Sequence, residues 1–151
     1  MANKMWKRTL TLAAAAILAL AFSLTCFAAE NEKILASYTE DLGNGITAVV
    51  TITETESFAR ATKRQSMSKK YYTGGTYIGA AVLTASFNYD GSTSSAVSAS
   101  GSGSGANGWS YSGQSTRTSG KTAYLTASFK KSSKTVPVSL SLTGDANGNV
   151  A

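Results

Sequence analysis

Apolar and polar residues alternate with a period of two along several segments of this chain, which is the pattern of a β-strand with one buried face. The apolar series fall in four runs, with threonine or serine at many of the intervening positions: 46–52, 81–89, 123–129 and 136–142. Residues that favour tight turns separate these runs, among them Gly43-Asn44-Gly45, Asp90-Gly91, Lys131-Ser132-Ser133-Lys134 and Asn147-Gly148. The pattern therefore predicts antiparallel strands joined by hairpin turns.

One heptapeptide occurs twice in the chain. Residues 81–87 read AVLTASF and residues 123–129 read AYLTASF, so six of the seven positions agree. Each copy is followed by a short polar turn and a second alternating segment, at 92–100 and 135–143 respectively. Whether the likeness comes from duplication or from chance in threonine-rich strands, it predicts two similar hairpins that face each other as the halves of a sandwich.

We therefore expect an all-β fold, an antiparallel two-sheet sandwich of the immunoglobulin-like kind with about seven strands. The expected core consists of Ile46, Ala48, Val50, Ile52, Leu83, Ala85, Phe87, Leu125, Ala127, Phe129, Val138, Leu140 and Leu142. Pro137 falls among the polar positions of the last run and cannot donate a ladder hydrogen bond, which predicts an edge strand or a strand start there. Because the core alanines are small, the sheets must approach closely beside them, or a large neighbour such as Trp109 must fill the space.

Two segments lack a clear strand pattern. Residues 57–76 are basic and show no clean period, so we expect a loop there with room for one helical turn. Residues 100–105 alternate strictly between serine and glycine, a composition typical of flexible linkers. Trp109 and Tyr111 follow with period-two spacing, and we expect them to anchor this segment to the core.

The first 28 residues have the composition of a secretory signal peptide. Lys4, Lys7 and Arg8 precede an uncharged apolar run, and Cys26-Phe27-Ala28 places small residues at positions −3 and −1 of a cleavage site. The run of about 15 residues is shorter than the roughly 20 that span a bilayer, which favours cleavage over a retained membrane anchor. The expected mature chain, 29–151, is a single β-sandwich domain that is secreted and keeps no stable membrane span.

Cleavage would remove the only cysteine, and the chain contains no histidine. The mature domain then has no disulfide, no thiol nucleophile and no imidazole base for a hydrolytic triad. No glycine-rich phosphate loop opens a helix, and residues 145–149 resemble only half of a calcium loop, for which a hairpin turn is the simpler interpretation. We therefore expect no enzymatic activity, no cofactor and no metal site.

The charge of the chain is positive and unevenly distributed. The formal net charge is +6, and removal of Lys4, Lys7 and Arg8 lowers it to +3. Acidic residues concentrate in 29–56, and most lysines and arginines follow. A basic region outside a cell favours anionic wall polymers, acidic glycans or lipid headgroups as partners, with ordinary solubilising charge as the simpler explanation. Export argues against nucleic acid.

Ten residues are candidate contacts for a glycan or wall polymer. The aromatic candidates, which offer flat stacking faces if they are exposed, are Trp109, Tyr111, Tyr71, Tyr72 and Tyr77. The basic candidates, which would meet anionic groups, are Arg60, Lys63, Arg64, Lys69 and Lys70. The alternative is that most of the aromatic residues anchor the core or the loops. We therefore expect an exported, non-enzymatic protein that binds cell-wall polymer or glycan, with a secreted interaction or toxin-like cationic protein acting on other cells as the alternative.

Four motifs follow one another in the second half of the chain: FNYDGS at 87–92, Gly108-Trp109, SGKTA at 119–123 and LSLTGDANG at 140–148. In this layout the chain resembles a group of small secreted proteins of Gram-positive, Clostridia-like bacteria. The resemblance covers roughly residues 75–150. It implies export and a β-rich domain, and, because that group has no assigned activity, it does not point to any catalytic chemistry.

Overall fold

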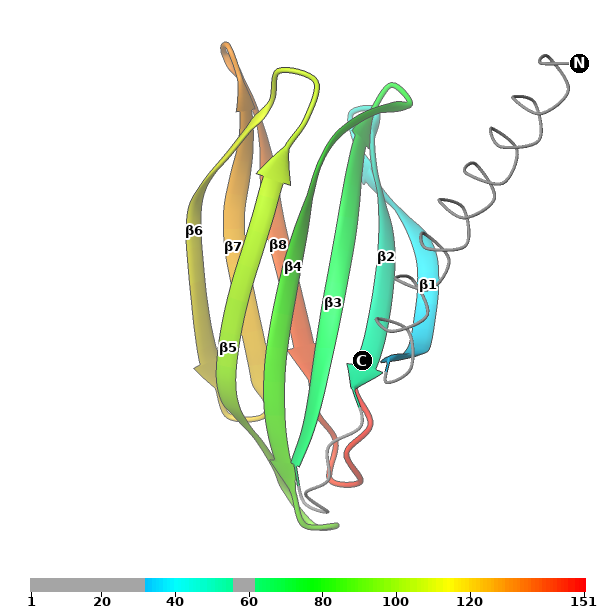
Figure 1. Cartoon of the computed structure of the whole chain (residues 1–151), viewed down its shortest axis with the longest axis vertical. Coiled ribbons are helices and arrows are strands. Elements are labelled where there is room, and N and C mark those ends of the chain that lie inside the picture. Colours follow the sequence, from blue (N-terminus) through cyan, green and yellow to red (C-terminus); the bar gives the residue numbers. More distant parts are fainter. Residues whose placement is uncertain (1–31, 56–61) are drawn as a thin grey trace, which may run out of the picture. The chain divides into compact units, whose positions relative to one another are not determined.

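Eight strands form two antiparallel sheets that pack face to face (Figure 1). The computed structural model describes residues 32–55 and 62–151, of which Lys33–Ala151 form one compact unit. The expected all-β sandwich is confirmed, with eight strands in place of about seven. The predicted signal peptide lies outside the described residues. Among those residues, the structure contains no helix that is long and apolar enough to cross a membrane.

Within each sheet the strands follow one another in chain order. The first sheet contains β1 (Glu32–Gly43), β2 (Ile46–Thr55), β3 (Thr62–Thr73), β4 (Thr76–Tyr89) and β5 (Ser94–Gly105). The second sheet contains β6 (Ser110–Ser119), β7 (Thr122–Lys131) and β8 (Lys134–Thr143). Consecutive strands are thus neighbours, as the turn signals predicted.

The core lies between the two sheets. The repeated heptapeptide is extended in both copies, one in β4 and one in β7, so the copies lie in opposite sheets as expected. Twelve of the thirteen expected core residues are buried, and Ile46 is partly buried. The structure adds Met67, Tyr71 and Ile78 to the core, and Tyr71 and Ile78 are among its largest fully buried side chains.

The expected loop at 57–76 is wrong over most of its length, because Thr62–Thr73 form strand β3. This strand alternates like the others, but its inward positions include Gln65 and Lys69, so the sequence shows no apolar period. The Gln65 side-chain amide donates to a glutamate oxygen at 2.7 Å, and Lys69 forms an ion pair with another glutamate at 2.7 Å. Polar side chains therefore occupy two core positions of β3. Lys69 and Nε2 of Gln65 have glutamate partners, whereas Oε1 of Gln65 is buried without a hydrogen-bond partner among the described residues.

The expected flexible serine/glycine linker is also wrong, because Ser94–Gly105 form strand β5, which pairs with β4. Its alternation of serine and glycine is a strand period in which the glycines face the second sheet. A Cβ at Gly101 would collide with the Leu125 side chain, and one at Gly103 would lie 2.7 Å from Cε1 of Tyr111. Glycine is needed because side chains of β6 and β7 fill the space that a β5 side chain would occupy.

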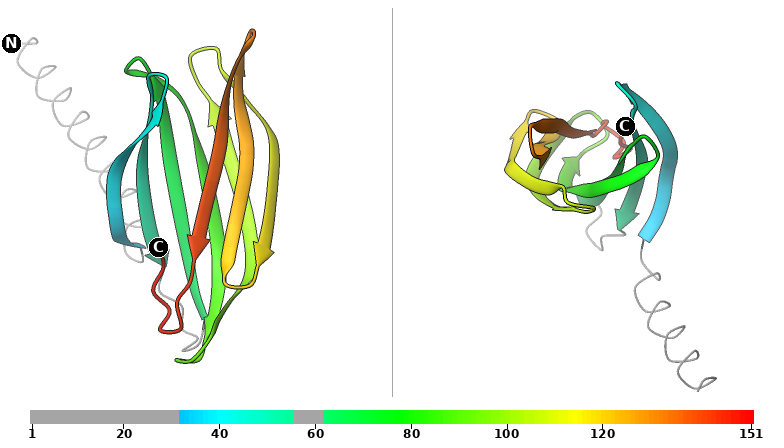
Figure 2. Two further views of the ribbon diagram at one scale, coloured as in Figure 1. Left: turned by 180° about the vertical axis from the view of Figure 1, so that it is seen from behind. Right: turned by 90° about the horizontal axis from the view of Figure 1, so that it is seen from above.

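The sandwich is closed along one lateral side and open along the other (Figure 2). On the closed side, β5 meets β6. A Cβ at Gly105 would lie 2.6 Å from the Trp109 carbonyl carbon, and the Ala96 amide donates to the Gly120 carbonyl at 2.9 Å. On the open side, β1 and β8 are the edges of their sheets. Pro137 is exposed on β8, which confirms the predicted edge strand.

Candidate functional site

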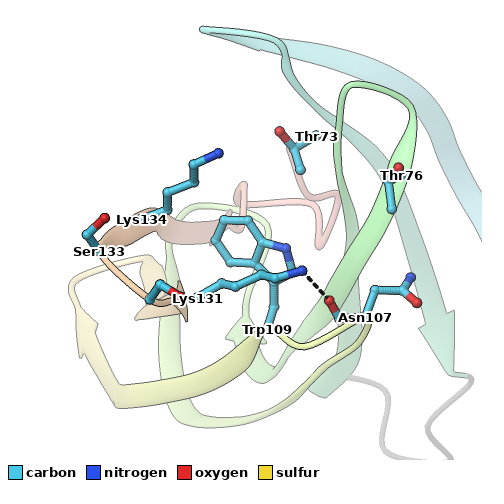
Figure 3. Close-up of a pocket in the computed structure, with 8 residues that line it drawn as sticks. Thr73, Thr76, Asn107, Trp109, Lys131, Ser133 and Lys134 are labelled. Atoms are coloured by element: carbon cyan, nitrogen blue, oxygen red, sulfur yellow. Dashed lines mark hydrogen bonds between the residues drawn. The ribbon is translucent and has the colours of Figure 1, made fainter.

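Three turns at one end of the sandwich enclose a pocket of about 440 Å³ (Figure 3). They are the β3–β4 turn, the β5–β6 connection and the β7–β8 turn. The residues that line the pocket are Thr73, Thr76, Asn107, Trp109, Lys131, Ser132, Ser133 and Lys134. One aromatic ring, two ammonium groups and four hydroxyl groups therefore surround the same space.

The β5–β6 connection is held in place by a tight turn at Asn107. Asn107 and Gly108 have φ values of 53° and 81°, a left-handed conformation that asparagine and glycine adopt readily. Nδ2 of Asn107 donates to the Tyr77 carbonyl at 2.7 Å, and Nζ of Lys131 donates to the Asn107 carbonyl at 2.9 Å. Asn107 thus links turns that belong to both sheets.

The chemistry of the pocket favours a ligand with hydroxyl groups and negative charge. The Trp109 indole lies among the lining side chains, with Lys134 to one side and Thr73 and Thr76 to the other, and the Lys131 side chain runs past the indole to the Asn107 carbonyl (Figure 3). An ammonium group has three donors, and the bond to the main chain uses one of those on Lys131. None of the lining residues is acidic, so the fixed side-chain charge around the pocket is positive.

Two of the predicted aromatic contacts pack against the core. Tyr71 is buried, which corrects the expectation that it offers a stacking face, and Tyr111 anchors its segment to the core as expected. Tyr71 is 1% exposed and packs against Phe129, with ring centroids 5.3 Å apart. Tyr111 is partly buried against the same Phe129 ring at 5.4 Å, and its hydroxyl donates to Oε1 of Gln114 at 2.9 Å. Burial raises the pKa of the Tyr111 hydroxyl. The Tyr111 ring fills the space above Gly103 of β5.

The other three aromatic candidates lie near the turns. Tyr72 and Tyr77 are partly buried and contact each other across the β3–β4 hairpin, with ring centroids 5.6 Å apart. Trp109 is partly buried and lines the pocket. Of the five predicted aromatic residues, only Trp109 is a lining residue of this pocket.

The predicted basic residues do not form one cluster. Lys63 and Lys69 form ion pairs with glutamates at 3.3 and 2.7 Å, and Lys69 is buried, which corrects the expectation that it meets a ligand. Arg64 and Lys70 are exposed on the outer face of β3. Arg60 lies outside the described residues. The cations that line the pocket are instead Lys131 and Lys134.

A second cavity of about 540 Å³ opens on the side where β1 and β8 are not joined. Its lining includes Tyr71 and the Lys69–Glu40 ion pair. Burial raises the pKa of the Tyr71 hydroxyl well above its ordinary value, and hydrogen bonding with the Ser139 backbone opposes this rise. Lys69, Glu40 and the Tyr71 hydroxyl are thus engaged by groups of neighbouring strands.

The segment that resembles half of a calcium loop is a hairpin turn. The Asp145 carboxylate accepts the Asn149 side-chain and backbone N–H groups at 3.0 and 2.8 Å, and the Asn147 backbone N–H at 2.9 Å. These bonds lower the pKa of the Asp145 carboxyl. Within residues 32–55 and 62–151, no three His, Cys, Asp or Glu side chains are grouped closely enough to hold a metal ion.

No protein family, curated protein or solved structure gives a significant match to this chain. The site is therefore interpreted from its own residues. Most of its lining residues escaped the sequence analysis, which treated 131–134 only as a hairpin turn. Lysine at both ends of that turn was the available clue, because a two-residue turn needs no charge on either side.

Proposed function

We propose that this protein is an exported, non-enzymatic module that binds anionic cell-surface polysaccharide through the Trp109 pocket. The observation that carries the proposal is the combination of one indole ring, two lysines and four hydroxyl groups around a space without acidic side chains. A sugar ring has an apolar face that packs on an indole, and its acidic substituents pair with ammonium groups. Threonine and serine supply further hydrogen bonds to sugar hydroxyls.

The expected affinity of one pocket is low. An exposed ion pair contributes at most about 1 kcal/mol, because water and salt screen it. A polymer with many equivalent units would still retain the protein if several pockets bind at once. Export, which the amino-terminal sequence predicts, would bring the pocket into contact with such polymers.

Trp109 provides a direct reporter of binding. The chain contains two tryptophans, and the predicted cleavage removes Trp6. Titration of the processed chain with an anionic wall polymer should therefore change the fluorescence of Trp109 alone. The apparent affinity should fall as salt rises, and a neutral glucan of similar length should bind more weakly. An unchanged spectrum over the whole titration would contradict the proposal.

A double substitution tests whether binding depends on the two pocket lysines or on the positive charge of the surface in general. Lys131→Gln combined with Lys134→Gln should weaken binding about tenfold at low salt, since two ion pairs are lost. Arg64→Gln combined with Lys70→Gln removes the same charge from the outer face of β3 and should leave binding nearly unchanged. Equal losses in the two variants would show that the protein binds by net charge and not through this pocket.

A further inference from the structure

Strand β1 carries most of the large hydrophobic side chains that the fold leaves exposed. Among the described residues, four of the five most exposed ones lie on β1: Ile34 (65%), Leu35 (37%), Tyr38 (49%) and Leu42 (40%). The fifth is Val97 (51%) on β5. The central residues 34–39 of β1 include no charge and no proline, which are the usual means of keeping an edge strand from pairing.

The other edge on the open side is protected. Thr143 exchanges backbone hydrogen bonds with Ala151 at 3.0 and 3.1 Å, so its N–H and C=O point away from β7. Alternate residues of an antiparallel strand point the same way, so Ser139 and Pro137 face that free side as well. Pro137 has no N–H, and the Ser139 backbone is engaged by Tyr71. Among the described residues, β8 therefore has two obstacles to a new strand, whereas residues 34–39 of β1 have neither a charge nor a proline.

We propose that β1 pairs with β1 of a second copy of this chain, antiparallel and about a two-fold axis at Tyr38. This arrangement would join the two five-stranded sheets edge to edge. It goes beyond the proposed glycan binding and does not depend on the Trp109 pocket.

The spacing of the exposed residues fits this symmetry. Ile34 and Leu42 lie four residues before and after Tyr38. A two-fold axis at Tyr38 therefore sets Ile34 opposite Leu42 of the second copy on both sides, with the two Tyr38 side chains opposite each other. Directly opposed apolar residues are the pairs that stabilise a sheet. On the other face of the joined sheet, Asp41 of the second copy lies opposite Leu35 and diagonal to Lys33, which gives two opposite-charge contacts.

A register shifted by two residues fits less well. An axis at Ser37 would set Ile34 opposite Glu40, and an axis at Thr39 would set Tyr38 opposite Glu40, whose carboxylate is already held by Lys69 at 2.7 Å. The axis at Tyr38 instead pairs three apolar positions on one face of the joined sheet. The pattern is thus self-complementary in one register, as an isologous interface requires.

Sedimentation equilibrium of the processed chain tests the interface. The parent chain should show a monomer–dimer equilibrium, and Tyr38→Lys should lower the association constant about tenfold or more. Val97→Lys is the matched control, because Val97 is equally exposed on another strand, and it should leave association unchanged. A parent chain that stays monomeric up to about 1 mM, or an equal effect of both substitutions, would overturn the proposal.

Disulfide trapping tests the register. Only Cys26 is present in the chain, and the predicted cleavage removes it, so an introduced cysteine is the sole thiol of the processed protein. With the axis at Tyr38, Ser37 lies opposite Thr39 of the second copy. An oxidised mixture of Ser37→Cys and Thr39→Cys should therefore give mainly the mixed dimer. Dominant dimers of Ser37→Cys or Thr39→Cys alone would overturn this register and the role assigned to Tyr38.

Discussion

The two lateral sides of the sandwich end the same five-stranded sheet in opposite ways. At β5, glycines replace inward side chains, and groups of β6 and β7 move into the space, so the two sheets meet. At β1, inward positions carry Ile34, Tyr38 and Leu42, which no strand of the second sheet covers fully. The comparison shows two ways in which a sheet edge can be kept from pairing at random. At β5 the second sheet of the same chain covers the edge, whereas at β1 the exposed apolar residues suit pairing with a second copy.

The largest expected difference between the two sides is in side-chain truncation. Leu125→Ala removes a fully buried side chain that packs against Gly101, and it should lower the free energy of unfolding by about 3 kcal/mol. Ile34→Ala on the open side should cost less than about 0.5 kcal/mol at protein concentrations where the chain is monomeric. Denaturant unfolding of both variants measures the difference. Equal losses would show that β1 is buried as deeply as the closed side.

A double-mutant cycle tests whether the closed side depends on glycine. Gly101→Ala alone should cost about 2 kcal/mol, because its methyl group collides with Leu125. In the Leu125→Ala background the same substitution should cost at least about 1 kcal/mol less, since the space is then free. Ser102→Ala, whose side chain is exposed beside it, is the control. Strictly additive losses would contradict the packing described for β5.

The Lys69–Glu40 ion pair on the open side should contribute less to the free energy of unfolding than the packing around Gly101 does. Glu40→Gln leaves the Lys69 ammonium without its partner, and we expect a loss of about 1 kcal/mol, because Glu40 is 39% exposed and water reaches the groove. Lys69→Met removes the buried charge itself and should change stability by less than about 0.5 kcal/mol. Thermal unfolding of both variants gives the comparison. A larger loss for Lys69→Met than for Glu40→Gln would mean that the pair is strongly stabilising.

The smallest expected effect concerns the turn that follows β8. A carboxyl whose pKa is lower in the folded chain stabilises the fold above its unfolded pKa, and this stabilisation is lost as the pH falls through the folded value. Hydrogen bonds lower the pKa of Asp145, and those from Thr93 and Ser92 lower that of Asp90. Stability should therefore decrease below about pH 4. Asp145→Asn should show a weaker decrease over that range in thermal unfolding, and an unchanged pH profile would contradict this assignment.

The strands that the sequence predicted share one property. In β2, β4, β7 and β8, nearly all inward positions carry apolar side chains, with Glu54 at the end of β2 and Gly79 in β4 as exceptions, and most outward positions carry threonine or serine. In β3 and β5 some inward positions carry polar residues or glycine, so the sequence shows no apolar period there. Lys69 is acceptable there because Glu40 pairs with it, and Gly101 is acceptable because Leu125 fills its place. Both compensations come from residues far away in the sequence, so a local pattern cannot contain them.

The same reason limits what the sequence revealed of the candidate site. Trp109 was among the predicted contacts, because an isolated tryptophan in a serine-rich segment is conspicuous. Its neighbours Lys131 and Lys134 belong to the β7–β8 turn, and Thr73 belongs to the β3–β4 turn of the first sheet. Only the topology brings these turns to one end of the sandwich. Tyr71 was predicted to contact a ligand but lies in the core, because aromatic character alone does not distinguish a core residue from a residue of a binding surface.

Hydrogen exchange of the backbone amides in β5 and β1 is the most direct test of the contrast between the two sides. In dilute solution, the β5 amides that pair with β4 should exchange as slowly as those in the centre of β4, although the segment is rich in serine and glycine. The outward amides of β1 should exchange quickly and become protected as the protein concentration rises. Fast exchange of the amides throughout 98–105 would contradict the conclusion that the β5 side is closed. Complete protection of the β1 amides at every dilution would contradict the conclusion that the β1 side is open.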